Sequence, residues 1–307
     1  MKDFHVYSPT DIIAANLRES AERRDALREQ EWAHLCELAA EIAQEESLPE
    51  LLSSLPDHRP STVSDASASP RWRMHATEQS VRLCMALSNQ LTKQKSFPVS
   101  ALLSDAEPSD TDAPARIIYQ KSSYTDEAYL ALSSLLSHPQ ASYAHSFHAS
   151  CEAVYNGECE YCILPVENSV EGELGTFSRL IDRYELKIAA TCEIVGNATA
   201  RSTRFALLRK KLLPIIEAPD AAYFFECTLP QGHSPEVSEL LAAAQMCGLR
   251  LYRINSLPQL SPDAAFAAHP CFLTTDADLR SFLLYLSMEA PHYTPIGLYP
   301  HLTRKGI

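Results

Sequence analysis

Apolar residues recur every three to four positions along residues 10–46 and again along residues 74–93, which predicts two long helices. The apolar positions of the first helix are Leu17, Leu27, Trp32, Leu35, Leu38 and Ile42. Residues 57–70 are rich in Pro and Ser and have no periodicity, and residues 104–114 are acidic and interrupted by proline, so both segments are predicted linkers. Residues 1–103 are therefore predicted to form a helical region that is tethered to the rest of the chain.

Beyond residue 115, short apolar runs of strand length alternate with segments of helical periodicity. This alternation predicts a mainly parallel sheet with helices on its faces. Residues 116–208 are too few for an eightfold barrel, so a truncated doubly wound α/β lobe is expected over residues 115–210. From about residue 220 the order is strand, helix, strand, strand, helix, strand, which predicts a ferredoxin-like βαββαβ domain over residues 218–303. The predicted fold class is multi-domain α/β.

Composition narrows the choice of partners. The 307 residues are 46% apolar and carry a formal net charge of −13, with a sequence pI of about 5.3. This charge disfavours a nucleic-acid partner, because binding to phosphates needs clustered Lys and Arg. We recognise no secretory leader and no apolar run long enough to cross a bilayer. Nine scattered cysteines suit a reducing compartment, so we expect a cytoplasmic protein without a membrane partner.

Cys159 and Cys162 form a CxxC pair. A zinc site would need a second pair or histidines at suitable spacing, and neither follows. A redox pair would favour a helix N-terminus, whereas Cys162 opens an apolar strand run. We interpret the pair as two unrelated thiols, and we expect no metal and no cofactor.

The apolar run from Tyr161 to Val166 ends in Glu167, Asn168 and Ser169, and a glycine follows. Two interpretations remain open. The polar residues can cap the next helix, or they can be presented to a polar ligand. Backbone amides and hydroxyls at a strand end that leads into a helix can bind a carboxylate without using lysines.

The surrounding sequence resembles a known family. GECEYCILPVENSVEGELGTFSRLIDRYELKI is similar to the prephenate dehydratase motif, in which a strand ends in Pro-Ile-Glu-Asn-Ser before a glycine and a helix. ARIIYQKSSYTDEAYLALSSLL resembles the opening strand and helix of that domain, and residues 202–205 resemble its Thr-Arg-Phe motif. The last ninety or so residues resemble an ACT domain. The N-terminal helices stand where a chorismate mutase domain lies in fused enzymes of phenylalanine synthesis. The resemblance implies a periplasmic-binding-protein-like lobe between a mutase-like remnant and the ACT-like domain.

The resemblance also implies an activity and its residues. Family members convert prephenate to phenylpyruvate with loss of water and carbon dioxide. Thr203 matches the family's essential threonine, which hydrogen-bonds or protonates the departing hydroxyl. Asn168 and Ser169 would bind a substrate carboxylate, Arg204 offers a planar fork for a carboxylate, and Glu167 would orient the turn. The implied ligands are the dicarboxylate prephenate and, as effector, L-phenylalanine, with a homo-oligomer formed through the ACT-like domain.

Four departures from the family pattern change these expectations. Only VGNATARS stands where family members insert a second lobe, so one wall of the cleft is missing. The glycine-rich loop after the first strand is replaced by a segment that starts with Lys121, which could supply a cation instead. Asn255 and Ser256 are the effector candidates, although the arginine and glutamate of that ACT segment are lost. On the N-terminal helix Arg18 remains, but Leu35 stands near the position of a mutase arginine, so no chorismate mutase activity is expected.

Three hypotheses follow. The chain is a compact prephenate dehydratase that completes its cleft with another subunit, and Thr203→Ala would then abolish its activity. Alternatively, it is a catalytically inactive paralogue that acts as a binding or regulatory subunit. The third hypothesis is a scaffold that dimerises through the ACT-like sheet and binds no small molecule.

Overall fold

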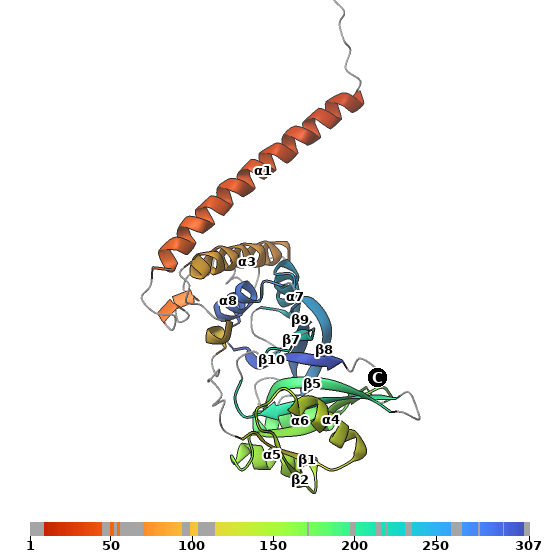
Figure 1. Ribbon diagram of the computed structural model, residues 1–307. Coiled ribbons are helices and arrows are strands. Elements are labelled where there is room, and N and C mark those ends of the chain that lie inside the picture. The colour runs from red at the N-terminus through yellow and green to blue at the C-terminus, as the bar shows by residue number, and fades with distance from the viewer. Residues whose placement is uncertain are drawn as a thin grey trace, which may run out of the picture.

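The computed structural model describes residues 9–44, 50–51, 54–55, 70–93, 99–103, 114–170, 172–196, 201–212, 216–218, 220–230, 235–258, 266–275, 277–290 and 292–303 (Figure 1). Apart from their last residues, Pro70 and Pro114, the two predicted linkers lie outside this description.

The two long helices predicted from the periodicity of the N-terminal sequence are present. They are α1 (Pro9–Ile42) and α3 (Pro70–Lys93), and a short 3-10 helix, η3 (Val99–Leu102), follows them. The C-terminal part of α1 packs on α3, whereas its N-terminal part projects away from the remaining elements (Figure 1). Leu17 and Leu27 are therefore 65% and 61% exposed, although they share the apolar spacing of the helix.

A lobe of alternating strands and helices follows. Its elements are β1 (Arg116–Gln120), α4 (Ser123–Ser133), β2 (Gln140–Ala144), α5 (Phe147–Tyr155), β3 (Tyr161–Asn168), β4 (Gly172–Glu173), α6 (Gly175–Tyr184), β5 (Lys187–Val195) and β6 (Ser202–Arg209). Strands β2, β1 and β3 are parallel, and β6 lies antiparallel between β3 and β5. Helix α4 packs on one face of this sheet and α5 and α6 pack on the other, as in a doubly wound layout.

The C-terminal part has the predicted βαββαβ order. Its elements are β7 (Ala222–Pro230), α7 (Val237–Met246), β8 (Arg250–Pro258), β9 (Phe266–Leu273), α8 (Leu279–Glu289) and β10 (Thr294–Thr303). Its four strands are antiparallel in the order β10-β7-β9-β8, which is the ferredoxin-like arrangement.

The two parts share one sheet. The end of β10 pairs in parallel with β5, from His301 opposite Thr191 to Thr303 opposite Glu193. The strand order is therefore β2-β1-β3-β6-β5-β10-β7-β9-β8, with β4 paired to β3. The boundary between the predicted lobe and the predicted ferredoxin-like domain thus runs through a continuous sheet. The sequence pattern does not reveal this join. The join forms because β10 extends past its pairing with β7 far enough to pair with β5.

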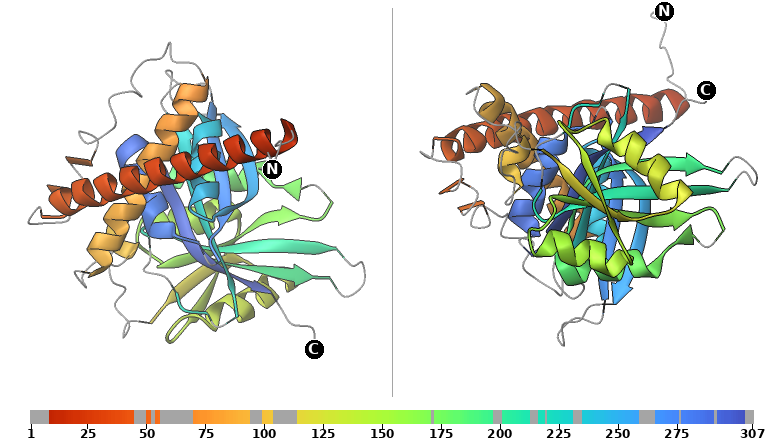
Figure 2. Two further views of the ribbon diagram at one scale, coloured as in Figure 1. Left: turned by 90° about the horizontal axis from the view of Figure 1, so that it is seen from above. Right: turned by 60° about the horizontal axis from the view of Figure 1, so that its bottom comes forward.

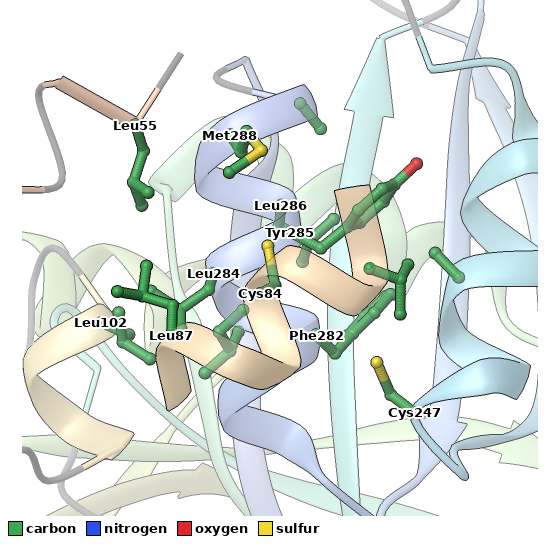
Figure 3. Packing of buried hydrophobic residues seen from close by; sticks show 14 of the residues in the cluster. Leu55, Cys84, Leu87, Leu102, Cys247, Phe282, Leu284, Tyr285, Leu286 and Met288 are labelled. Carbon is green, nitrogen blue, oxygen red and sulfur yellow. The ribbon is translucent and has the colours of Figure 1, made fainter. Parts of the chain in front are cut away.

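The described residues form three apolar clusters. In the first, α3 and η3 cover α7, α8 and one face of the C-terminal strands, with Phe282, Leu284 and Leu286 of α8 at its centre (Figure 3). The second lies on the other face of those strands and continues beneath α5 and α6 of the lobe, so Phe224 and Phe177 belong to one cluster. The third lies between α4 and the lobe sheet. The second cluster buries Phe224, Cys271 and Tyr299 on the helix-free face of the ferredoxin-like part.

Candidate functional site

The polar end of β3 closes a local turn. Oδ1 of Asn168 accepts a hydrogen bond from the Val170 amide at 2.9 Å. Oγ of Ser169 accepts one from the Ser202 amide at 3.1 Å, and the Ser169 amide donates to the Ser202 carbonyl at 2.9 Å. The Asn168 side chain therefore closes the turn itself, and the Ser169 side chain holds the end of β3 against the start of β6. Their predicted role as carboxylate ligands stays a prediction.

Strand β6 brings the second motif beside the first. Asn168 stands opposite Thr203 and Glu167 stands opposite Arg204 in the antiparallel register of β3 and β6. Thr203 is half-buried, and its hydroxyl makes no hydrogen bond to the part of the chain that the structure describes. The two motifs, which are more than thirty residues apart in sequence, thus lie side by side, while the catalytic role of Thr203 remains a prediction.

Glu167 and Tyr252 both contact one edge of the Arg204 guanidinium. Its Nε lies 3.3 Å from Oε1 of Glu167, and its Nη2 donates to the Tyr252 hydroxyl at 2.5 Å. The guanidinium also stacks over the Tyr252 ring at 5.1 Å. Burial alone would lower the pKa of Arg204, but Glu167 and Tyr252 raise it above the ordinary arginine value. The arginine is therefore a permanent cation with two internal partners.

Glu167 links Arg204 to a second arginine. Oε2 of Glu167 lies 3.3 Å from Nη1 of Arg253 on β8, and Nη2 of Arg253 lies 2.7 Å from Oε1 of Glu226 on β7. We call these four residues the ionic cluster: Glu167, Arg204, Arg253 and Glu226. The cluster joins the lobe to the ferredoxin-like part through alternating charges.

Glu226 is the buried anchor of the ionic cluster, with no exposed side-chain surface. Nε2 of His269 lies 2.9 Å from its Oε1, and the Tyr299 hydroxyl donates to its Oε2 at 2.5 Å. Burial would raise the pKa of Glu226, but His269, Arg253 and Tyr299 outweigh burial and lower it well below the ordinary value. The carboxylate is therefore ionised in the folded protein at all physiological pH values.

A β-bulge explains how β8 reaches Arg204. The register of β8 against β9 slips by one residue between Leu251 and Arg253, so Tyr252 is the extra residue. The register of β3 against β6 also slips by one residue, between Pro165 and Glu167, and this second bulge bends the end of β3. Because bulges bend a strand and increase its twist, the sheet can bring β6 and β8 together although four strands separate them in the order.

The remaining predicted residues lie apart from this group. Nζ of Lys121 lies 4.7 Å from the centre of the Tyr143 ring on β2, so it faces the outer strand rather than β3. Asn255 and Ser256 lie on β8, opposite His269 and Ala268, and Ser256 is exposed. The structure thus brings Glu167, Asn168, Ser169, Thr203 and Arg204 to neighbouring positions on β3 and β6. Thr203 and Arg204 face opposite sides of the sheet, because successive side chains of a strand alternate. Lys121 is not part of this group.

Sequence reasoning missed the C-terminal contributors to this site. They are Glu226, Tyr252, Arg253, His269 and Tyr299. One signal was available: a charged residue interrupts the apolar strand of β7 in FFECTL and the strand of β8 in LYRIN. Buried charges in strands are uncommon unless they are paired, so two opposite charges in two strands of one domain suggest each other as partners.

Hollows elsewhere on the described surface include the following three. One of about 720 Å³ lies between α3 and α7, beside Met74 and Met246. One of about 320 Å³ lies between α4 and the ends of β5 and β10. The smallest, of about 110 Å³, is apolar and lies beside the middle of β3, lined by Leu164 and Phe177. None of these three is lined by Thr203 or Arg204.

The cysteine pair divides between two environments. Cys162 is buried, while Cys159 is half-buried with its sulfur 3.8 Å from the Ser142 hydroxyl. The hydrogen bond with the Cys151 thiol, together with burial, raises the pKa of Cys162 well above its ordinary value, so it is held as a thiol. Among the residues with a described placement, no three His, Cys, Asp or Glu side chains gather as a metal site would require.

A comparison with protein families decides the kinship of the lobe. A family model described as prephenate dehydratase matches residues 119–195, about a quarter of the chain, from β1 to the end of β5. Residues 119–195 belong to the prephenate dehydratase family. The resemblance predicted from the sequence is confirmed for this segment, which contains Glu167, Asn168 and Ser169. The prephenate dehydratase match ends before Thr203 and Arg204.

Solved structures give weaker likenesses. A prephenate dehydratase from Streptococcus mutans is 20% identical, with 61% of this chain and 98% of that chain covered, at a TM-score of 0.48. A prephenate dehydratase from Arthrobacter aurescens in complex with L-Phe is 14% identical, with 60% of this chain and 89% of that chain covered, at a TM-score of 0.45. GqqA, described as a novel type of quorum quenching acylase, is 17% identical, with 61% of this chain and 96% of that chain covered, at a TM-score of 0.45. These likenesses say nothing of the site. No curated protein matches the chain.

The helices of the described residues were also compared with the requirements of a membrane span. None of them is both long enough and apolar enough to cross a bilayer.

Proposed function

We propose that the chain is a non-catalytic member of the prephenate dehydratase family that acts as a binding or regulatory subunit in L-phenylalanine biosynthesis. The observation that carries this proposal is the state of Arg204. Its Nε lies 3.3 Å from Glu167 and its Nη2 donates to Tyr252, so the arginine has internal partners where a substrate carboxylate would be needed. A dehydratase site would have to break both contacts before it bound its substrate.

The short link between β5 and β6 supports the same proposal. Strand β5 ends at Val195 and β6 begins at Ser202, and the Gly196 amide donates to the Arg201 carbonyl at 2.8 Å. The two strands thus form a hairpin that extends beyond the rest of the sheet (Figure 2). Six residues cannot fold into a second lobe, so this hairpin does not contribute an opposing wall for excluding water from a reaction.

One observation favours the active alternative, a prephenate dehydratase that forms phenylpyruvate, water and carbon dioxide. The Thr203 hydroxyl is half-buried beside Asn168 and makes no hydrogen bond to the described residues. Such a hydroxyl could protonate or hydrogen-bond a departing group if another subunit closed the site.

The test is phenylpyruvate formation from prephenate by the purified full chain. Thr203→Ala serves as the control, because it removes the hydroxyl and leaves the Arg204 contacts in place. We expect equal, background rates from both proteins. A rate that is above background in the wild type and is lost in Thr203→Ala would refute the non-catalytic role and establish the active alternative.

We extend the proposal to organisation and partners. We propose that residues 1–103 are a chorismate-mutase-like remnant without mutase activity, that 115–210 are the dehydratase-like lobe and that 218–303 are an ACT-like domain. The ferredoxin-like strand order supports the last assignment. We further propose prephenate as ligand, L-phenylalanine as effector near Asn255 and Ser256, and a homo-oligomer formed through the ACT-like domain. All nine cysteines are free, which suits the cytoplasm that we propose as its location. A rise in melting temperature with either ligand would support these assignments.

A further inference from the structure

The ionic cluster contains two arginines that converge on one carboxylate. Arg204 comes from β6 of the lobe and Arg253 from β8 of the ferredoxin-like part, yet each approaches a different oxygen of Glu167 at 3.3 Å. The side chains of these arginines are only 12% and 14% exposed, and that of Glu167 is 29% exposed. A carboxylate held between two guanidiniums near the surface is the arrangement by which proteins bind carboxylate ligands.

Glu167 makes only long contacts with the two arginines. Charge-assisted hydrogen bonds between a guanidinium and a carboxylate are usually about 2.7–2.9 Å long, and both contacts of Glu167 are longer. Nε of Arg204 is buried without a hydrogen bond to any described group, so its approach to Glu167 is an ion pair without hydrogen-bond geometry. Nε of Arg253 is also buried without a hydrogen bond. The two arginines therefore have donors that a better placed carboxylate could use.

Tyr252 completes the arrangement. Nε and Nη2 form the edge of a guanidinium that binds a carboxylate side-on. On Arg204 this edge faces one oxygen of Glu167 and the hydroxyl oxygen of Tyr252. The Tyr252 hydroxyl oxygen thus stands where one oxygen of a side-on carboxylate would bind, and an oxygen of Glu167 lies beside the place of the other. Tyr252 is 48% exposed, so its ring lies at the solvent boundary and can move without opening the core.

We propose that Arg204 and Arg253 form a binding site for a small aromatic carboxylate, and that Glu167 and the Tyr252 hydroxyl occupy this site when the ligand is absent. The ligand displaces both oxygens from the side-on edge of Arg204, and its ring packs on Tyr252 or Phe224, whose rings are 5.0 Å apart. The inference rests on the proposed binding role, and it adds the class of ligand and the residues that compete with it.

The test measures carboxylate binding by the full chain. Sodium acetate and sodium phenylacetate are compared with sodium chloride at equal ionic strength, by calorimetry and by melting temperature. In Glu167→Ala the internal carboxylate is gone, so acetate should bind about tenfold or more tightly than to the wild type, as expected for regained charge-assisted hydrogen bonds. Phenylacetate should bind more tightly than acetate, because its ring buries apolar surface.

A matched control is available in Glu160. This glutamate pairs with Arg116 at 2.6 Å, but both side chains are more than 40% exposed. Glu160→Ala should therefore bind acetate no better than the wild type does. Adding Arg204→Met to Glu167→Ala should remove the gain.

A second variant covers the case in which Glu167→Ala does not fold. Tyr252→Phe removes only the hydroxyl that accepts from Nη2 of Arg204, at a half-exposed position, and it should also bind acetate more tightly than the wild type does. Equal acetate affinity in the wild type and Tyr252→Phe, or in Glu167→Ala and Glu160→Ala, would overturn the proposal. Neither result depends on turnover, so phenylpyruvate formation by the wild type would refute the non-catalytic role and leave this test standing.

Discussion

Arg204 and Tyr252 are 48 residues apart in sequence and lie on β6 and β8, yet Nη2 of Arg204 donates to the Tyr252 hydroxyl at 2.5 Å and the guanidinium stacks over the Tyr252 ring at 5.1 Å. The hydrogen bond ties the Thr-Arg-Phe segment to the outermost strand of the ferredoxin-like part. Any movement of that strand relative to the lobe must break or lengthen it.

We predict that this contact is energetically coupled. Arg204→Met and Tyr252→Phe should each lower the free energy of unfolding, and the double variant should lose less than the sum of the two. The expected coupling is about 1 kcal/mol, as for a hydrogen bond to a charged group at a partly exposed site. Urea unfolding of the four proteins measures it. Additive losses would show that the two side chains act independently.

Glu226→Gln tests the buried anchor of the ionic cluster. The substitution keeps the shape of the side chain but removes the charge that offsets Arg253, whose Nη2 lies 2.7 Å from Oε1. Because Arg253 then stays buried with only its longer contact to Glu167, we predict a loss of about 3–5 kcal/mol in the free energy of unfolding.

The exposed pair of Glu160 with Arg116 is the comparison for this variant. Glu160→Gln should cost less than about 1 kcal/mol, because solvent screens an exposed pair. Similar losses in Glu226→Gln and Glu160→Gln, measured by urea unfolding, would mean that the buried carboxylate is not structurally important.

Periodicity predicted most elements of the sheet because their apolar runs are buried. The pattern did not predict strands β2 and β4 or helix α5. Strand β2 has the sequence QASYA, and its first four residues are exposed at the edge of the sheet, so no apolar signal marks it. Helix α5 has only nine residues, too few for a clear period. Edge strands and short helices obtain their structure from neighbours rather than from their own pattern.

The site was predictable only on its lobe side. The strand-end polar residues and Arg204 stand out in the sequence, because the family motif contains them. Their partners Tyr252 and Arg253 reach the site through a one-residue bulge and the curvature of a ten-stranded sheet. Neither feature has a signature in residue type, since a bulge is a property of the pairing between two strands.

Gly297→Ala tests the junction between β5 and β10. A Cβ atom at Gly297 would lie 2.6 Å from the Ile188 carbonyl oxygen and 2.8 Å from Cδ1 of Tyr299, closer than real Cβ atoms come. The strands must separate to admit it, so we predict a loss of about 1–3 kcal/mol in the free energy of unfolding. At Gly175 a Cβ would meet nothing within 4 Å, so Gly175→Ala should be tolerated. Equal melting temperatures of the two variants would contradict the close approach at Gly297.

His301 gives the junction a predicted pH dependence. Burial and the nearby charge of Arg204 lower its pKa from 6.5 to about 4, although Glu193 acts in the opposite direction. Nδ1 of His301 lies 2.9 Å from the Thr191 hydroxyl. The unfolded chain therefore takes up a proton near pH 6.5, whereas the folded chain does so only near pH 4. Since the unfolded state binds more protons between these values, stability should fall by up to about 3 kcal/mol as the pH is lowered through this window.

His301→Gln removes this titration and keeps a side chain that can bond to Thr191. Urea unfolding between pH 7 and pH 4 should show a smaller loss of stability for this variant than for the wild type. His34→Gln is the control, because that histidine lies on α1 with its side chain 80% exposed. The free energy of unfolding of His34→Gln should depend on pH as it does in the wild type. If His301→Gln loses stability as steeply as the wild type, the buried histidine is not what makes the junction sensitive to acid, and the carboxylates of the ionic cluster become the next groups to test.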